Sequence, residues 1–461
     1  MSQMAPTAPI DLSLPQPAQL EEAVALAAAA ARAGGASGFA IAASAHTGLS
    51  LALREQEVES LEFQRDRDLG ITVYFGQRKG NAGTADFRPE AIQEAVAAAC
   101  SIARHTQDDA ANGLPDADRL ATHFPDLQLD HPSRYSLEQL LQTGRACEAR
   151  GLAHSAISAS DGLHLSASRH SSLLHNSDGF HGWRQSSDYG LSLTLIGEDA
   201  GGKRRDYWYS HALDDSAYAQ ADAVADQAIE RVRRGLNPRQ PRTGRYPVLF
   251  PPELARGLIG SLLGAISGGA LYRRASFLLE AMDSPLFPQS VQILQRPLQA
   301  RQFGSASFDA EGVATAERAL VEDGILRGWL LGSYSARKLG LSSTGNAGGA
   351  QRIEVAPTFA GGLKEMMREA GSGLLLTSLM GQGVKLTTGD YSRGATGIWF
   401  ENGEPAYPVH ECTIAGNLRE MFRDLQAIGH DVDPHSSIAI GSLWLAQMTI
   451  AGEDQPDDSS D

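Results

Sequence analysis

The alternation of apolar and polar residues predicts a layered α/β unit at the start of the chain. Residues 20–32 are rich in alanine and are followed by Gly34-Gly35, which is typical of a helix and its C-terminal stop. Apolar side chains then recur at mostly alternate positions, which predicts four short strands, over residues 38–44, 49–55, 57–64 and 70–77. Residues 88–104 form a second predicted helix, because Pro89 suits a first helical turn. A helix, a sheet and a helix in this order indicate packed layers.

The middle of the chain combines strands with two further predicted helices. Residues 115–135 carry several prolines and acidic residues, a composition that is typical of a linker. Three elements are expected after this linker, a helix, a strand-rich stretch and a long helix, over residues 136–150, 155–196 and 218–236. Within the strand-rich stretch, turns are predicted at Asp161-Gly162 and at residues 177–179.

A second linker, residues 237–244, precedes a large glycine-rich region. This region is predicted to contain many short strands, of which the first is expected at residues 246–250. Two helices are expected among them, over residues 252–268 and 417–428. Asp323-Gly324 predicts a tight hairpin turn.

These elements predict an α+β protein with a small N-terminal α/β unit, a strand-rich central unit and a large glycine-rich mixed α/β C-terminal domain. The expected divisions are residues 1–16 as a flexible arm, 17–114 as the N-terminal domain, 115–135 as a linker, 136–236 as the central domain, 237–244 as a linker, 245–452 as the C-terminal domain and 453–461 as a disordered acidic tail.

Charge and composition narrow the classes of partner. The 461 residues carry a formal net charge of −16, with 39 Lys and Arg against 55 Asp and Glu. A surface that binds nucleic acid or anionic lipid needs a basic excess, so we expect neither nucleic acid nor a membrane as partner. The three cysteines are far apart and form no CxxC pair, and the first residues do not resemble a signal peptide. These features predict a cytoplasmic protein.

The most informative segment spans residues 380–403, MGQGVKLTTGDYSRGATGIWFENG. Six glycines surround the Asp-Tyr-Ser-Arg tetrad at residues 390–393, and glycine lets the backbone turn through positive φ or approach another chain closely. The pattern predicts a strand, a glycine-lined loop that carries the tetrad, a second strand and a tight turn at Asn402-Gly403. Such a loop would suit a surface that holds extended polypeptide.

Three long motifs carry a family resemblance: GDYSRGATG followed by WFENGEPAYPVHECTIAGNL, LLGSYSARKLGLSSTGNAGG at residues 330–349 and AISGGALYRRASFLLE at residues 265–280. They resemble the TldD/PmbA family, and its PmbA (TldE) branch in particular, over most of the chain. The resemblance implies one subunit of a cytoplasmic zinc metallopeptidase complex that cuts unfolded or flexible polypeptides in an enclosed chamber. It also implies that a TldD-type paralogue supplies the metal site.

The positions that correspond to the zinc motif decide which subunit this is. TldD-type subunits carry His-Glu-x-x-x-His on a helix, in which two imidazoles bind zinc and the glutamate activates water. Aligned on the arginine pair at residues 273–274, this chain has Gly260, Ser261 and Ala265 at those positions. The family's third ligand, a cysteine, has no counterpart in residues 436–443. We therefore expect no cofactor in this chain and zinc in the partner subunit, with this chain building the chamber and holding substrate.

The expected contacts with substrate or partner lie in the same motifs: Tyr272, Arg273, Gly381, Gly383, Asp390, Tyr391, Ser392 and Arg393. Asp390 and Arg393 fit equally well a purely structural role in which they hold the loop. One alternative function is an autonomous hydrolase that uses Asp390, Ser392 and Arg393, which would need a histidine of the same chain beside them. A second is a non-catalytic scaffold or regulatory binding protein.

Two further patterns have competing interpretations. Four histidines fall within 18 residues of the central unit: His164, His170, His175 and His181. Their parity places two on each face of a sheet, which favours polar strand positions over a metal site. Gly260, Gly264 and Gly268 lie on neighbouring positions of one helix face, which favours close packing in the core or contact with another subunit.

Overall fold

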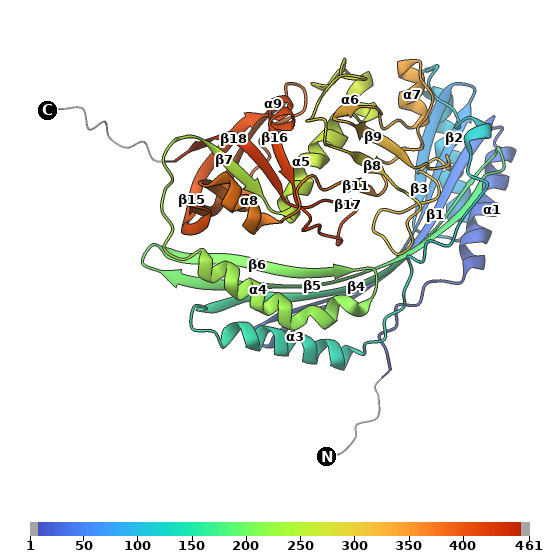
Figure 1. The fold of residues 1–461 in the computed structure, drawn as a ribbon. Helices are drawn as coiled ribbons and strands as arrows, with labels where there is room; N and C mark the ends of the chain where they lie inside the picture. Colours follow the sequence, from blue (N-terminus) through green and yellow to red (C-terminus); the bar gives the residue numbers. More distant parts are fainter. Residues whose placement is uncertain (1–7, 453–461) are drawn as a thin grey trace.

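A computed structural model describes residues 8–452, and its mixture of helices and strands confirms the α+β class (Figure 1). Residues 1–7 of the predicted arm and the predicted acidic tail at 453–461 lie outside the described residues. Within the described range, no helix is both long and apolar enough to cross a membrane. The strands form three sheets, one in the N-terminal half and two in the C-terminal domain.

One antiparallel sheet is shared by the predicted N-terminal and central units. Its strand order is β3-β2-β1-β4-β5-β6. The strands are β1 Gly38–Arg54, β2 Glu57–Phe75, β3 Arg78–Thr84, β4 Ala159–Asn176, β5 His181–Asp199 and β6 Gly202–Ala212. The two units meet where β1 pairs with β4, in a ladder that runs from Ala40 opposite Asn176 to Leu53 opposite Leu163.

Two long strands replace the four short strands predicted between residues 38 and 77. β1 and β2 form a single hairpin, and the predicted gaps at residues 45–48 and 65–69 lie within its ladder. In an antiparallel sheet only one face needs to be apolar. Polar residues such as His46 and Asp66 therefore remain in the ladder, although their polarity suggested loops.

Of the two turns predicted in the strand-rich central stretch, one is present and one is wrong. Residues 177–179 do connect β4 to β5. Asp161-Gly162 instead lies inside β4, at a register shift where Gly162 has a φ of 119°. The unpaired residue and the positive φ identify a β-bulge, for which glycine is suited. β6 was not predicted.

Four helices cover one face of this sheet: α1 Pro17–Ala33, α2 Pro89–His105, α3 Leu137–Leu152 and α4 Ala221–Arg234. α1 packs against β1, and α2 packs against β2 and β3. Figure 1 shows α3 and α4 along the part of the sheet formed by β4 to β6. All four confirm predicted helices. Ser136 caps α3, and a 3₁₀ turn, η2 Asp215–Gln220, replaces the first part of the helix predicted at 218–236.

The described part of the predicted flexible arm is docked on the core. Ile10 and Leu12 are buried in the same cluster as Leu49 and Leu51 of β1. The backbone N–H of Ile10 also donates to the carbonyl of Tyr135 at 2.9 Å. Burial of two apolar side chains offsets the entropy of ordering this short segment, so the expectation of flexibility is wrong for residues 10–12.

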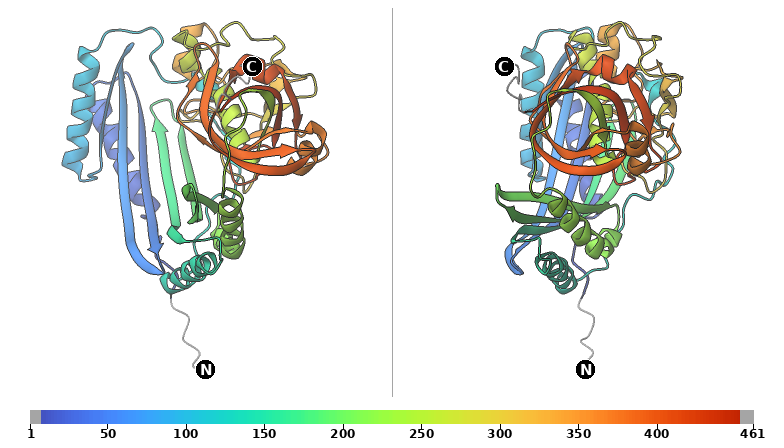
Figure 2. Two further views of the ribbon diagram at one scale, coloured as in Figure 1. Left: turned by 90° about the vertical axis from the view of Figure 1, so that its left-hand side faces the viewer. Right: turned by 60° about the vertical axis from the view of Figure 1, so that its left-hand side comes forward.

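The C-terminal domain is built on strands that curl into a closed ring (Figure 2). The ring strands are β7 Gly244–Phe250, β12 Gly373–Met380, β14 Asp390–Glu401, β15 Glu404–Asn417 and β18 Leu443–Ala451. Closure results because β12 pairs with β7 on one side and with β14 on the other. Two short strands, β13 Val384–Lys385 and β16 Leu425–Ile428, extend the ring at β14 and β18.

Helix α5 Pro252–Ala265 packs one side into the core of this domain. The helix predicted over residues 252–268 is interrupted, because Ser267 caps a separate short helix, α6 Gly268–Tyr272. The helix predicted at 417–428 is likewise shorter. It consists of α9 Leu418–Arg423 followed by β16, which pairs with β18 and buries Ile428.

A five-stranded sheet and two short helices complete the C-terminal domain. Its order is β10-β9-β8-β11-β17, with bounds β8 Ile293–Gln295, β9 Arg318–Glu322, β10 Ile325–Leu326, β11 Ile353–Val355 and β17 Ile438–Ala439. The helices are α7 Ser333–Leu339 and α8 Leu363–Ala370. The predicted tight turns at Asp323-Gly324 and Asn402-Gly403 are confirmed, with positive φ at each of these residues.

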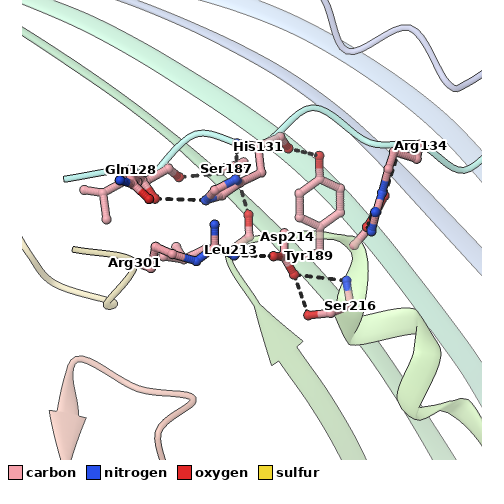
Figure 3. A network of polar contacts seen from close by, with 11 residues as sticks. Gln128, His131, Arg134, Ser187, Tyr189, Leu213, Asp214, Ser216 and Arg301 are labelled. Carbon is pink, nitrogen blue, oxygen red and sulfur yellow. Dashed lines mark hydrogen bonds and ion pairs between the residues drawn. The ribbon is translucent and has the colours of Figure 1, made fainter. Parts of the chain in front are cut away.

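The segment between α2 and α3, which includes the 3₁₀ turn η1 Ala117–Arg119, joins the sheet to the C-terminal domain. Tyr189 of β5 donates its hydroxyl to the carbonyl of His131 at 2.6 Å, and Arg301 donates its backbone N–H to the carbonyl of Leu127 at 2.8 Å (Figure 3). Arg301 also forms an ion pair with Asp214 at 2.7 Å. The segment predicted as a linker is therefore bonded on both sides.

Candidate functional site

A cleft of about 1260 Å³ lies between β6 and the ring of the C-terminal domain. β6 is the last strand in its sheet, so within residues 8–452 its outer edge pairs with no other strand. Residues 203–210 of β6 all border the cleft. Because successive side chains of a strand point to opposite faces, an unbroken run of lining residues means that the strand edge itself follows the cleft.

The opposite wall of the cleft consists of ring strands. Residues 375–378 and Met380 of β12, 396–398 of β14 and 409–411 of β15 contribute to it. The cleft thus offers a free strand edge on one side and a rigid closed sheet on the other. An extended polypeptide could pair with such an edge through main-chain hydrogen bonds, largely independent of its sequence.

Arg231 of α4 holds the two walls together. Its Nε donates to Asp206 of β6 at 3.0 Å, and its Nη1 donates to Glu253 of α5 at 3.2 Å. Its Nη2 donates to the carbonyl of Thr377 in β12 at 2.6 Å. Burial raises the pKa of Glu253, and the charge of Arg231 opposes that shift. One guanidinium therefore fixes the spacing of the cleft at its base.

Aromatic side chains of β6 shape the cleft. Tyr207 is 50 % exposed, and the ring of Trp208 lies 5.1 Å from the guanidinium of Arg231. Tyr209 accepts a hydrogen bond from Arg256 of α5 at 3.1 Å. Aromatic rings beside charged groups provide both apolar area and hydrogen bonding, a combination found where proteins bind peptides.

His211, near the C-terminal end of β6, links the six-stranded sheet to the C-terminal domain. Its Nε2 lies 2.6 Å from Asp188 of β5, and its Nδ1 lies 3.2 Å from the carbonyl of His435 in the C-terminal domain. Its ring stacks on Phe303 at 4.4 Å. The hydrogen bond to Asp188 raises the pKa of His211. In the charged form both ring nitrogens donate, so protonation strengthens the link between the domains.

One face of α5 runs from the cleft to the segment that follows β12. Glu253, Gly257, Gly260 and Gly264 are spaced so that they share this face. A Cβ at Gly257 or Gly260 would meet no atom within 4 Å, whereas one at Gly264 would lie 3.1 Å from Leu386. Close packing, one of the two interpretations of the glycine pattern, is therefore wrong for Gly260.

Gly268, the third glycine of that pattern, does pack closely. A Cβ there would lie 2.1 Å from the hydroxyl of Ser335 in α7. It belongs to α6 rather than α5. Gly260 and Gly268 thus have different surroundings despite their regular spacing, because α5 ends before α6 begins.

The positions that correspond to the zinc motif lie on and beside the open face of α5. Gly260 is exposed, Ser261 donates its hydroxyl to the carbonyl of Gly257 at 3.0 Å, and Ala265 is buried. Zinc in proteins is bound by imidazole, thiolate or carboxylate groups, so these three side chains do not fit it. In residues 436–443, Ile440 shares a core cluster with Ile259 of α5. The described residues contain no group of three His, Cys, Asp or Glu that could hold a metal ion.

The tetrad at residues 390–393 lies in strand β14, so its prediction as a loop is wrong. Asp390 and Ser392 are exposed, whereas Tyr391 is buried and Arg393 is half-buried. Neighbouring side chains therefore point to opposite faces, and the four do not converge. Burial raises the pKa of Tyr391 to about 12. Within residues 8–452, no histidine is hydrogen-bonded to the side chains of the tetrad.

The glycines at 381 and 383 explain why this segment becomes a strand. A Cβ at Gly383 would lie 1.5 Å from the carbonyl oxygen of Ser392, and the backbone N–H of Ser392 donates to the carbonyl of Gly383 at 2.7 Å. Gly381 has a φ of 77°. Glycine thus lets β13 approach β14 closely enough to extend the sheet.

Tyr272 and Arg273 lie at a different junction and do not line the cleft. The ring of Tyr272 packs edge-on against Tyr334 of α7 at 5.6 Å, and Arg273 donates to the hydroxyl of Tyr272 at 3.2 Å. Tyr334 in turn donates to Asp109, beyond α2, at 2.8 Å. The predicted contact residues therefore fall in two separate regions.

The central histidines are distributed as their parity predicted. His164 and His170 are exposed on one face of β4, and His175 lies on the other face. The rings of His175 and His181 are 5.6 Å apart across the β4–β5 pair. His181 is hydrogen-bonded to Glu21 of α1 at 3.0 Å. Strand and helix neighbours thus account for these side chains.

β6 and Arg231, which shape the cleft, were not predicted from the sequence. A signal was present in residues 202–212, GKRRDYWYSHA, because aromatic residues favour strands and Gly201-Gly202 favours a turn before them. Arg231 gave no such signal. Its role depends on partners in three other elements, β6, α5 and β12.

Comparison with known proteins identifies the family of the chain. Models of the three domains of the PmbA/TldA metallopeptidases match, the first domain at residues 40–103, the central domain at 130–236 and the C-terminal domain at 243–452. The Metalloprotease PmbA of Escherichia coli O157:H7 is 42 % identical over 397 residues, covering 86 % of this chain and 88 % of that protein. A Metalloprotease PmbA homolog of Haemophilus influenzae is 41 % identical over 396 residues, with the same coverage.

Solved structures share the fold. TldE from Thermococcus kodakarensis superposes with a TM-score of 0.78 at 19 % identity, covering 93 % of this chain and all of that one, 100 %. A Bacteroides thetaiotaomicron protein, described as a proposed modulator of DNA gyrase, gives a TM-score of 0.88 at 23 % identity, covering 94 % of this chain and 99 % of that one. At these identities the likeness establishes the fold alone.

Proposed function

Because this chain belongs to the PmbA/TldA metallopeptidase family, in its PmbA (TldE) branch, we propose that it holds extended polypeptide for a zinc-bearing partner subunit and does not hydrolyse it alone. The partner would be a TldD-type paralogue, and the complex would act in the cytoplasm on unfolded or flexible chains. The relatives named as metalloproteases support peptidase activity for the family.

The observation that carries this proposal is the chemistry of α5. At the positions where the resemblance expects two zinc ligands and a base, the helix offers a hydrogen, a hydroxyl and a methyl group, at Gly260, Ser261 and Ala265. None can coordinate zinc or accept a proton from water at neutral pH. The described residues offer no replacement cluster, so the hydrolytic step would belong to the partner.

The free edge of β6 supports the holding role. Residues 203–210 border the cleft, and the unpaired main-chain groups of this edge would pair with an added strand. Met380, Thr396 and Gly397 border the same cleft, whereas the predicted contact residues Gly381, Gly383 and 390–393 do not. Arg393 lies on the opposite face of β14 from Asp390 and Ser392, and within residues 8–452 no histidine is hydrogen-bonded to these side chains, which disfavours the alternative of an autonomous hydrolase.

The proposal can be tested with the purified chain, alone and mixed with its TldD-type paralogue. A quenched fluorescent peptide without stable structure would report cleavage, and elemental analysis would count zinc per subunit. We expect cleavage and zinc only when the paralogue is present, and loss of both after chelation. Cleavage by the isolated chain that survives chelation would contradict the proposal.

Two matched variants separate the alternatives in the same assay. Ser392→Ala and Asp390→Asn should leave the activity of the mixture unchanged, since neither side chain has a role in hydrolysis under the proposal. If either variant abolished cleavage while the complex still formed, the tetrad would have to be reconsidered as catalytic.

A further inference from the structure

The six-stranded sheet has a second free edge, on the side away from the C-terminal ring (Figure 2). β3 pairs with β2 only from Leu69 to Phe75. Within the described residues, the outer edge of residues 57–68 therefore pairs with no strand, and nearly every side chain along it is exposed. Long unpaired edges invite pairing with another chain, and proteins usually shorten, cover or bulge them.

This edge carries apolar side chains that continue the core of the sheet. Val58 is 42 % exposed, Leu61 is 40 % exposed and Phe63 is 55 % exposed. Their cross-strand partners in β1 are the buried residues Leu53, Leu51 and Leu49. An apolar stripe thus extends from the core onto an open edge. Such a stripe is typical of a surface that another protein covers.

The edge is held in a fixed position by the helix beneath its turn. Glu148 of α3 is fully buried, and its carboxylate accepts hydrogen bonds from the backbone N–H groups of Glu55 at 3.0 Å and Gln56 at 2.5 Å. Arg145 donates to the carbonyl of Gln56 at 3.0 Å. A pre-organised edge loses little conformational entropy when a strand is added to it.

The opposite face of the same edge is acidic. Glu62, Asp66 and Asp68 share it, and within residues 8–452 none of these carboxylates forms an ion pair. The arginines of the edge lie on the apolar face and already have partners. Arg65 pairs with Asp11 at 2.7 Å, and Arg67 lies 4.8 Å from the ring of Phe87.

Charge therefore discriminates between possible occupants. An antiparallel pair of two copies of this chain would add the acidic face of one copy to that of the other, and like charges on neighbouring strands repel. A different chain with Lys or Arg on that face would be attracted. The edge also lies apart from the cleft, where substrate is proposed to bind.

We propose that residues 57–68 are the docking edge for a strand of the zinc-bearing partner subunit. Its apolar side chains would cover Leu61 and Phe63, and its Lys or Arg side chains would face Glu62, Asp66 and Asp68. This inference rests on the proposed function, because that function supplies the partner. It assigns the six-stranded sheet two roles, with substrate at β6 and the partner at β2.

The test uses the full chain and its TldD-type paralogue, with affinity measured by titration calorimetry. Leu61→Asp with Phe63→Asp should weaken the complex at least tenfold, and Glu62→Lys with Asp66→Lys should do the same. The matched control is Leu341→Asp, a leucine that is 49 % exposed elsewhere, which should bind like the unmodified chain. Circular dichroism and urea unfolding would verify that each variant is folded.

A second measurement needs no destabilising change. The three native cysteines are buried, so in Gln64→Cys the new thiol is exposed on the edge and reacts selectively with a maleimide dye. Binding of the paralogue should slow labelling at least tenfold. Unchanged labelling in a formed complex, together with normal affinity of both double variants, would overturn the docking edge while leaving the proposed function intact.

Two other outcomes have distinct meanings. If the unmodified chain bound no paralogue at all, the proposed function and this inference would both fail. If the chain alone formed a dimer that Leu61→Asp with Phe63→Asp dissociated, the occupant would be a second copy. That result would overturn the assignment to the partner subunit.

Discussion

The six-stranded sheet and the C-terminal ring handle strand edges in opposite ways. In the ring, β12 pairs with both β7 and β14, so every main strand has two neighbours. The sheet leaves β6 and residues 57–68 of β2 open. A closed ring is a rigid base for α5, whereas open edges can take up further strands. Under the proposed function, the open sheet would recognise substrate and partner, and the closed ring would position α5.

The glycines of the ring show what closure requires. Gly397 of β14 packs so tightly against β12 that a Cβ would lie 2.4 Å from the carbonyl oxygen of Leu375. The edge at residues 57–68 contains no glycine and has exposed side chains instead. The strands of the ring pack too closely for a further strand to insert between them, whereas the main chain at the edge of the six-stranded sheet is accessible to an added strand.

The largest expected effect comes from a matched pair of phenylalanines. Phe400 of the ring is fully buried, and Phe63 of the sheet edge is 55 % exposed. Phe400→Ala should lower the free energy of unfolding by about 3–5 kcal/mol, because it leaves a core cavity. Phe63→Ala should change it by less than about 0.5 kcal/mol. Urea unfolding followed by fluorescence would measure both, and equal effects would contradict the contrast.

The contact between the two regions depends on Arg231. Arg231→Met should cost about 3 kcal/mol in unfolding free energy, since it leaves the carboxylates of Asp206 and Glu253 without their buried partner. Arg234→Met on the same helix removes only an exposed ion pair and should cost less than about 1 kcal/mol. Similar unfolding midpoints for the two variants would show that Arg231 does not join the regions.

Protonation of His211 should strengthen the contact between the six-stranded sheet and the C-terminal domain, and so raise the free energy of unfolding. Its folded pKa is raised above 6.5 by Asp188, so its contribution to stability is complete below that pH and is lost as pH rises through the folded pKa. The stability difference between the unmodified chain and His211→Asn should therefore shrink as pH rises above 6.5.

The effect of Asp309 on the pH dependence of stability must be distinguished from that of His211. Burial raises the pKa of Asp309 from its usual 3.8 to about 6, so its contribution to stability is complete below pH 3.8 and is lost as pH rises to about 6. Asp309→Asn should remove the change in unfolding free energy between about pH 3.8 and pH 6, and it should leave the change above pH 6.5 that His211 causes. A flat pH profile for the unmodified chain above pH 6 would contradict the role of His211.

The smallest expected effect concerns the cleft. Tyr207→Ala should weaken binding of an extended peptide about fivefold, which corresponds to about 1 kcal/mol of apolar contact. The control is Phe124→Ala, a 44 % exposed aromatic that does not line the cleft. Fluorescence anisotropy of a labelled peptide would compare them. Equal binding by the unmodified chain and Tyr207→Ala would place the peptide elsewhere.

Local signals predicted the helices well but not the long strands. Ser136 caps α3 and Pro89 begins α2, and both signals lie within the first turn of the helix they start. The continuity of β1 depends on pairing with β4, more than one hundred residues away, so polar residues at 45–48 were taken for a break. The tetrad at 390–393 was assigned to a loop because its polar residues lie among glycines, although it pairs with the nearby strands β13 and β15.

The joint between β1 and β4 has a practical consequence for dividing the molecule. The first and second family domains, at residues 40–103 and 130–236, each contribute strands to one ladder, so neither holds a complete sheet. A fragment that stopped at residue 114 would uncover the whole length of β1 and its row of unpaired amides. We expect such a fragment to aggregate, and the smallest unit that folds independently to extend through α4.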